Sequence, residues 1–307
     1  MGYLLILGAA LLNIVKAYSS KKLSRETECI RDNIDLSIMR NIFCVMVGAL
    51  FILFTAGADF RLPWQGVIIC LIAGAVMSVN YVAWVMALKS DAILFASTAN
   101  NANFIVVAIF GIFVFKEELT WTRAVAMAVI LLALLFMTKY QKGIGKSPKL
   151  YDFVLLLLVF LAGGASSVTE KYFTKTPALK GVSPHLYTFY AFFFAVVLLS
   201  LLRPLMKGEP ERTQEATRHK LLVFLPHALV MGIAIYGVTY FKTLSNKYLD
   251  TIVLYPLNNG LTLVGSCIMA WICFKEKPNK YSLVGMALVF FALLLSSGTV
   301  DAWLGLK

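Results

Sequence analysis

Two apolar segments of the chain end in closely similar sequences, Phe115-Lys-Glu-Glu118 and Phe274-Lys-Glu-Lys277, which lie 159 positions apart. The residues around them match at the same offset, so that Asn100 falls on Asn259. A repeat of this length means that the chain contains two copies of one structural unit. The repeat therefore decides the architecture before any single residue does.

The composition is that of a membrane protein. Hydrophobic residues make up 60% of the 307 residues, charged residues make up 14%, and the mean hydropathy is +0.79. A soluble globular domain carries about 25% charged residues, so this chain cannot surround itself with a water-facing surface. Its apolar runs have roughly the 20 residues that a helix needs to cross the hydrocarbon core. Because backbone polar groups need internal partners in hydrocarbon, these runs are predicted to be helices.

The sequence predicts an all-α integral membrane protein with ten transmembrane helices. The first span has neither a charged leading region nor a small-residue cleavage site, so we expect it to be retained as a helix. The predicted spans are residues 2–19, 38–57, 64–88, 92–115, 121–138, 152–172, 184–204, 221–244, 251–273 and 279–298.

Five helices in each copy is an odd number, and this parity sets the relation between the copies. The second copy must start on the opposite side of the membrane, so the two copies are inverted. We expect a first repeat over 1–140, a basic linker over 141–150 and a second repeat over 151–307, packed around a central cavity. Many secondary transporters are built in this way, with the substrate site near the midplane where the repeats meet.

Each copy resembles an EamA-type module of the drug/metabolite transporter superfamily. In the matching region a helix ends in an apolar-x-Glu element, and a small residue follows nine positions after the Glu. The family often has a proline about 14 residues before this Glu, where the present chain has Asn103 and Thr262. The resemblance implies ten helices around a central cavity and transport of small metabolites by alternating access. The matching residues are Glu117 with Ala126, and Glu276 with Gly285.

Polar residues near the centres of the spans are the best indicators of a functional site, because an unpaired polar group in hydrocarbon is costly. In the ninth span, Tyr255, Asn259 and Thr262 are spaced so that they lie on one helix face. At the 159-residue offset, the fourth span has Asn100 and Asn103 in equivalent places. These residues either line a cavity or bond only to neighbouring helices, and the matched pattern favours a cavity.

The third and eighth spans carry a second matched pair. At an offset of 156 residues, Asn80 falls on Tyr236 and Trp84 falls on Tyr240. Lys16, in the first span, either faces the same cavity or extends to the membrane interface. The predicted substrate-binding residues are Lys16, Asn80, Trp84, Asn100, Asn103, Tyr236, Tyr240, Tyr255, Asn259 and Thr262.

Carboxylates are expected outside the membrane centre, because every Asp and Glu falls in a predicted loop or near a helix end. Arg40, Glu170, Lys171 and Lys242 lie near helix ends and are expected at the interface. This pattern argues against a proton-coupled exporter of lipophilic cations, which uses a central carboxylate. Amides and aromatic rings suit a neutral or zwitterionic solute, or an anion if Lys16 faces inward.

Two other functions remain compatible with the sequence. Trp84, Tyr236, Tyr240 and Tyr255 can form an aromatic cage for cation–π contact, which would suit export of a quaternary amine or drug-like cation. The second alternative is a polytopic membrane enzyme or a non-transporting membrane subunit. Tyr151-Asp152 matches half of the signature of an intramembrane aspartyl protease, but no intramembrane GxGD partner exists, so we expect no enzyme activity.

No cofactor or metal site is predicted, because the five cysteines and three histidines are scattered. The net charge of +12 comes largely from the loops and indicates topology and contact with anionic lipids rather than nucleic-acid binding. The predicted partners are a small-molecule metabolite and the lipid bilayer. Protons or a counter-substrate are the candidates for coupling.

The orientation of the chain has two conflicting indications. About two thirds of the lysines and arginines lie on the side that bears loop 20–36, and the positive-inside rule then places both termini outside. The family resemblance implies that both termini lie in the cytoplasm. We follow the resemblance and expect a multi-pass protein of a bacterial inner or cell membrane.

Overall fold

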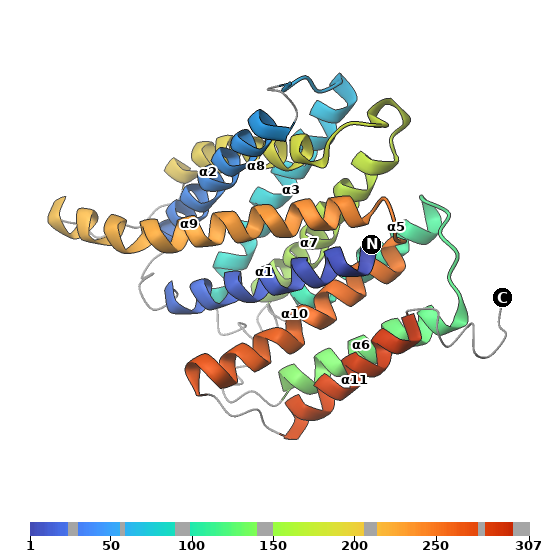
Figure 1. Ribbon diagram of the computed structural model, residues 1–307. Coiled ribbons are helices and arrows are strands. Elements are labelled where there is room, and N and C mark those ends of the chain that lie inside the picture. Colours follow the sequence, from blue (N-terminus) through green and yellow to red (C-terminus); the bar gives the residue numbers. More distant parts are fainter. Residues whose placement is uncertain are drawn as a thin grey trace.

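The computed structural model (Figure 1) describes residues 1–23, 30–55, 59–89, 99–139, 150–205, 214–275 and 280–296. These residues form ten α-helices and two short 3-10 helices, without a β-strand. The predicted all-α fold is therefore confirmed. The α-helices are α1 (Gly2–Leu23), α2 (Ile30–Thr55), α3 (Trp64–Lys89), α5 (Phe104–Phe113), α6 (Trp121–Lys139), α7 (Leu150–Lys175), α8 (Pro184–Leu202), α9 (Gln214–Ser245), α10 (Thr251–Phe274) and α11 (Lys280–Ser296).

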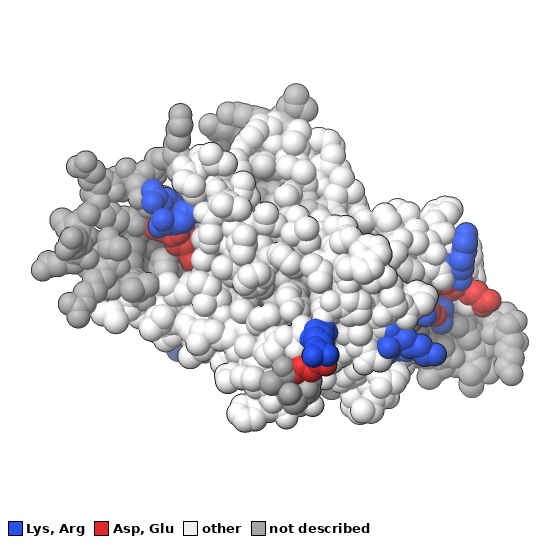
Figure 2. All heavy atoms as spheres, turned by 90° about the horizontal axis from the view of Figure 1, so that it is seen from above, with Lys and Arg blue, Asp and Glu red and all other residues white. Residues whose placement is uncertain are grey.

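The helices have the length and composition of membrane spans. Seven of the described helices are long and apolar enough to cross a membrane, and three shorter apolar helices accompany them. Large apolar side chains such as Phe54 and Trp121 face outward. Figure 2 shows a face of the molecule that is almost free of charge, with the charged side chains confined to a few small groups. The chain is a multi-pass membrane protein, as its composition predicted.

The helix packing has the symmetry of two repeats. Helices α1, α2, α3, α5 and α6 have α7, α8, α9, α10 and α11 as their counterparts. When each helix is replaced by its counterpart in the other repeat, every main contact between the repeats becomes another contact that is also present. Helix α1 packs on α9 as α7 packs on α3, and α1 packs on α10 as α7 packs on α5. Three further contacts join a helix to its own counterpart in the other repeat: α2 with α8, α5 with α10, and α6 with α11 (Figure 1). Two inverted five-helix repeats were predicted, and this prediction is confirmed.

Two glycines mark equivalent points in this arrangement. A Cβ added to Gly74 of α3 would lie 2.8 Å from the backbone nitrogen of Ala195 on α8. A Cβ added to Gly232 of α9 would lie 2.8 Å from the carbonyl oxygen of Arg40 on α2. Both neighbours are backbone atoms, so only glycine lets these helices approach so closely. Because the two glycines play the same part, their positions set an offset of 158 residues between α3 and α9.

The first repeat contains a helix that is interrupted close to its polar residues. Residues 99–102 are helical, Asn103 forms a turn, and α5 begins at the next residue. Beside this interruption, the backbone carbonyl of Asn101 accepts a hydrogen bond from Asn259 of α10. In the second repeat, by contrast, α10 continues through Pro256.

We expect Gly74→Ala to destabilise the protein by about 1–3 kcal/mol, because α3 and α8 must move apart to admit the methyl group. The measurement is the apparent melting temperature of the protein purified in detergent. Val79→Leu is a matched control, because Val79 lies on the same helix but is exposed. An unchanged melting temperature for Gly74→Ala would contradict the role of this close contact.

Candidate functional site

A cavity of about 340 Å³ lies between the two repeats. Side chains from α1, α3, α7, α9 and α10 line it, together with the segment that leads into α5, Arg40 of α2 and Phe192 of α8. The structure thus brings together the polar stripes of four different helices. Eight of the ten predicted substrate-binding residues are on the wall: Lys16, Asn80, Trp84, Asn100, Asn103, Tyr255, Asn259 and Thr262.

The other two predicted residues, Tyr236 and Tyr240, are not part of the described wall. Their rings stack on His185 of α8 at centroid distances of 6.0 and 4.0 Å. The prediction failed for these two residues because it used the wrong offset between α3 and α9. The sequence comparison used 156 residues, whereas Gly74 and Gly232 indicate 158, and two residues correspond to about 200° of rotation around a helix. The tyrosines therefore face away from the cavity.

The corrected offset identifies the α9 residues that do line the cavity. At 158 residues, Asn80 corresponds to Val238 and Trp84 corresponds to Lys242, and all four are on the wall. Lys242 thus occupies the place that the shorter offset gave to Tyr240. The two repeats consequently present different chemistry at this position, an indole in α3 and an ammonium group in α9.

Several amides on the wall bond to neighbouring helices. The Nδ2 group of Asn80 donates to the carbonyl oxygen of Val159 on α7 at 3.0 Å. The Nδ2 group of Asn259 donates to the carbonyl oxygen of Asn101 at 2.9 Å and to Oδ1 of Asn103 at 3.2 Å. These bonds join α3 to α7 and α10 to the interrupted helix. The sequence left open whether these amides line a cavity or join helices, and here they do both.

Three of the eight predicted residues on the wall keep their polar groups free. Among the residues that the structure describes, the side chains of Lys16, Trp84 and Asn100 make no hydrogen bond or ion pair. Thr262 differs from them, because its hydroxyl accepts a hydrogen bond from Asn13 of α1 at 3.2 Å. The polar groups of these three residues are therefore available to bind a solute.

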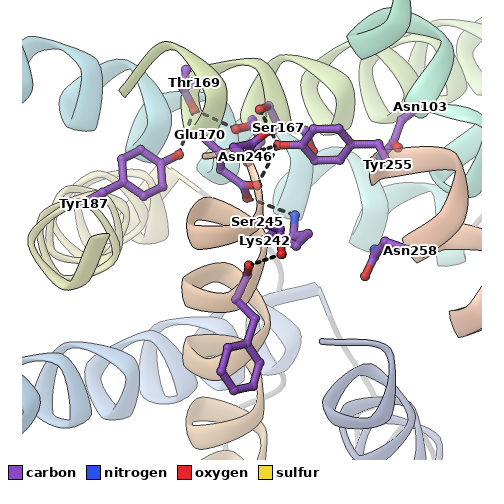
Figure 3. A network of polar contacts seen from close by, with 12 residues as sticks. Asn103, Ser167, Thr169, Glu170, Tyr187, Lys242, Ser245, Asn246, Tyr255 and Asn258 are labelled. Carbon is purple, nitrogen blue, oxygen red and sulfur yellow. Dashed lines mark hydrogen bonds and ion pairs between the residues drawn. The ribbon is translucent and has the colours of Figure 1, made fainter. Parts of the chain in front are cut away.

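A buried network closes one end of the cavity (Figure 3). The Nζ atom of Lys242 lies 2.9 Å from Oε1 of Glu170. The hydroxyl of Tyr255 lies 2.9 Å from Oε2 of Glu170 and 2.8 Å from the carbonyl oxygen of Ser167, and it accepts a hydrogen bond from Asn246. We call these five residues the floor network. They join α7, α9 and α10 at the end where α10 begins.

The charged residues on the wall of the cavity correct two expectations from the sequence. Glu170 is 1% exposed and lies on the wall of the cavity, so a carboxylate is present inside the helix bundle. Lys242 and Arg40 also line the cavity, although they were expected at the membrane interface. A buried charge requires a partner or hydrogen bonds, and Glu170 has both. Glu170 lies near the end of α7, as expected, but it is a buried carboxylate beside the cavity and not an interfacial one.

The sequence contains a signal that would have found Glu170. When α7 is aligned on α1 at an offset of 154 residues, Tyr172 falls on Tyr18. Glu170 then falls on Lys16, and both line the cavity. Arg40 was missed for a different reason, because it is one basic residue near the start of an apolar span and no repeat match points to it.

A second buried ion pair lies farther from the cavity at the same end. The Nζ atom of Lys171 lies 2.9 Å from Oε1 of Glu117 and donates to the carbonyl oxygen of Leu249 at 3.1 Å. Oε2 of Glu117 accepts hydrogen bonds from the Thr251 hydroxyl at 2.5 Å and from the backbone N–H of Ile252 at 3.2 Å. We call these five residues the outer closure. It ties the first repeat to α7 and α10 of the second.

Glu117 of the outer closure keeps its negative charge at neutral pH. Burial acts to raise the pKa of Glu117, but the hydrogen bonds from Thr251 and the charge of Lys171 outweigh burial, so this pKa lies below its usual value. The side chains of Glu117 and Lys171 are 5% and 1% exposed. The outer closure and the floor network together shut the cavity from water at this end.

Comparisons with known proteins agree with this architecture. A sequence profile of the EamA-like transporter family matches residues 1–139 and 149–298, which together are nearly the whole chain. A solved crystal structure of a protein with 15% sequence identity matches 100% of this chain and 99% of that chain, with a TM-score of 0.74. At this identity the likeness shows the fold alone. A comparison with curated protein sequences gives no match.

We expect Lys242→Met to lower stability by about 3 kcal/mol, because it leaves the buried carboxylate of Glu170 without its cation. The double variant Glu170→Gln/Lys242→Met removes both charges and is expected to recover most of this loss. Apparent melting temperatures of the single and double variants provide the test. Equal losses in the two variants would show that the pair is not coupled.

Proposed function

Because the chain belongs to the EamA-like transporter family, we propose that it is a secondary transporter that carries a small polar metabolite through the cavity by alternating access. Membership implies secondary transport and not an enzyme. The observation that carries the proposal is a polar cavity between two inverted repeats, shut at one end by two layers of buried contacts. The proposed binding residues are Lys16, Asn80, Trp84, Asn100, Asn103, Tyr255, Asn259 and Thr262.

The size of the cavity supports a small solute. Ligand sites commonly have volumes of about 300–1,000 Å³, and this cavity, at about 340 Å³, is near the lower limit. Its wall combines amides, hydroxyls and an indole with charged groups. Such a wall fits a compact polar metabolite and offers little room for a bulky lipophilic drug.

The symmetry of the repeats supports alternating access. Because the contacts of α1 with α9 mirror those of α7 with α3, exchanging the two packing arrangements converts a state closed at one end into a state closed at the other. We propose that the repeats over 1–140 and 151–307 make this exchange in a bacterial cell membrane. The outer closure must then break in each cycle. Protons, with Glu170 as a candidate acceptor, or a counter-substrate would provide the coupling.

The geometry supports the alternative of an aromatic cage less well. Two of its four proposed members, Tyr236 and Tyr240, pack on His185 away from the cavity. The hydroxyl of a third, Tyr255, is bound in the floor network. The basic residues of the wall also oppose a bound cation. Export of a quaternary amine is therefore not the function that this site favours.

We expect Asn100→Ala to reduce flux at least about tenfold while the protein still folds, because its amide has no structural partner to lose and is available to a solute. A thermal-shift screen with amino acids, sugars, nucleosides, organic acids and choline would identify the solute, since a bound ligand raises apparent stability. Flux is then measured in proteoliposomes. Gln65→Ala, an amide outside the cavity, is the control. Full flux in Asn100→Ala would contradict this binding site.

Breaking the outer closure is expected to open the shut end. In a background without native cysteines, Ile252→Cys should react slowly with a membrane-impermeant maleimide, because Ile252 is 2% exposed. Adding Glu117→Gln should speed this reaction several-fold, because the buried ion pair with Lys171 is lost. Glu118→Gln, which changes the exposed neighbour, should leave it unchanged. Equal labelling rates in all three would show that the outer closure does not control access.

A further inference from the structure

The charges on the wall of the cavity point to one class of solute. Building on the proposed transport function, we propose that the substrate is a small organic anion whose acidic group binds between Lys16 of α1 and Arg40 of α2. Both side chains line the cavity, and each comes from the first repeat. The carbon skeleton of the solute would then lie against the amides and the indole of the wall.

The described wall has an excess of positive charge. It carries three basic residues, Lys16, Arg40 and Lys242, and one acidic residue, Glu170. Lys242 and Glu170 neutralise each other at 2.9 Å. Two positive charges are left over on the described wall. Because Coulomb attraction is stronger in a low-dielectric interior than in water, this excess favours a solute of negative charge.

Lys16 is the basic residue that most clearly needs a counter-ion. Within the described part of the chain, its Nζ atom forms no ion pair and no hydrogen bond. The charges that act on it belong to Arg40 and Lys242, which have the same sign. Like charges that converge on one cavity repel each other and are costly to desolvate. A bound anion would relieve this repulsion.

Arg40 keeps its charge available although it contacts an aromatic ring. Its guanidinium carbon lies 4.4 Å from the centroid of the Tyr81 ring. This cation–π contact holds the side chain in place without neutralising it. Its Nε atom is buried and has no hydrogen-bond partner among the described residues. A planar guanidinium donates in a fork that matches the oxygens of a carboxylate or a phosphate.

The described wall offers no free acid for an amino group. Both carboxylate oxygens of Glu170 are engaged, Oε1 by Lys242 and Oε2 by Tyr255. A zwitterion or an amine would therefore place its positive charge beside basic residues. The unpaired indole N–H of Trp84 and the amide of Asn100 are donors, which suits the oxygen-rich surface of an organic anion.

Pairs of charged and uncharged solutes of similar shape test the class. Thermal stabilisation of the purified protein at low salt would be measured with succinate against succinamide, and with glycerol 3-phosphate against glycerol, with choline as the cation. We expect at least one anion to stabilise the protein and its uncharged partner to have no effect. The two pairs also separate carboxylate from phosphate recognition. Stabilisation by choline or the uncharged solutes alone, or by none of the five, would overturn the proposal.

Variants of Lys16 separate a specific site from a general effect of anions. Lys16→Met should weaken binding of the anion on the order of tenfold, because one charge-assisted hydrogen bond is lost. Lys16→Arg keeps the charge and should bind nearly as well as the native protein. Lys180→Met removes an exposed lysine outside the cavity and should have no effect. Equal affinity in the native protein and Lys16→Met would overturn the assignment.

Two further measurements keep the proposal testable if Lys16→Met folds poorly and separate binding from transport. Arg40→Lys keeps the charge but removes the fork of N–H groups, so it should also weaken binding, and it reports on the site even if Lys16→Met folds poorly. Counterflow of the stabilising solute in proteoliposomes tests transport separately. Binding of an anion without counterflow would overturn the transport function and leave the anion site intact. Counterflow of an uncharged solute alone would overturn the anion site and leave the transport function intact.

Discussion

Charges inside a low-dielectric helix bundle must be paired, and α7 carries two neighbouring residues that meet this constraint at one end of the molecule. Glu170 pairs with Lys242 of α9, and Lys171 pairs with Glu117 at the end of the first repeat. Successive residues on a helix point about 100° apart, so one turn of α7 holds both partners. The closed end of the cavity depends on this turn. Because Glu170 is already paired, Lys16 faces the cavity without an acid.

Duplication supplies the scaffold of this protein, and departures from duplication supply the chemistry of its cavity. Gly74 and Gly232 are identical because both repeats need the same close approach between helices. On the wall of the cavity, however, Lys16 stands opposite Glu170 in the repeat alignment, and the place of Trp84 is taken by a lysine. A solute therefore meets two different half-sites, although the helices that carry them pack in the same way.

The sequence predicted the fold well because hydrophobic length and repeat parity do not depend on details of packing. It also placed Asn259 and Thr262 on the cavity wall, because the 159-residue offset between α5 and α10 was correct. Tyr236 was misplaced because the comparison used an offset of 156 residues between α3 and α9, whereas the equivalent glycines Gly74 and Gly232 indicate 158. The burial of Glu170 could not be read from its place near a helix end, because its contacts come from Lys242 of α9 and Tyr255 of α10, which are distant in the sequence.

The same asymmetry bears on how the protein changes state. In the repeat alignment, the position of Glu117 corresponds to Glu276, but the position of Lys171 corresponds to Ala17. A closure of the opposite end by the equivalent elements therefore lacks the lysine that holds the described closure. The two end states consequently differ in electrostatic energy, and a ligand can offset this difference only through its differential affinity for them.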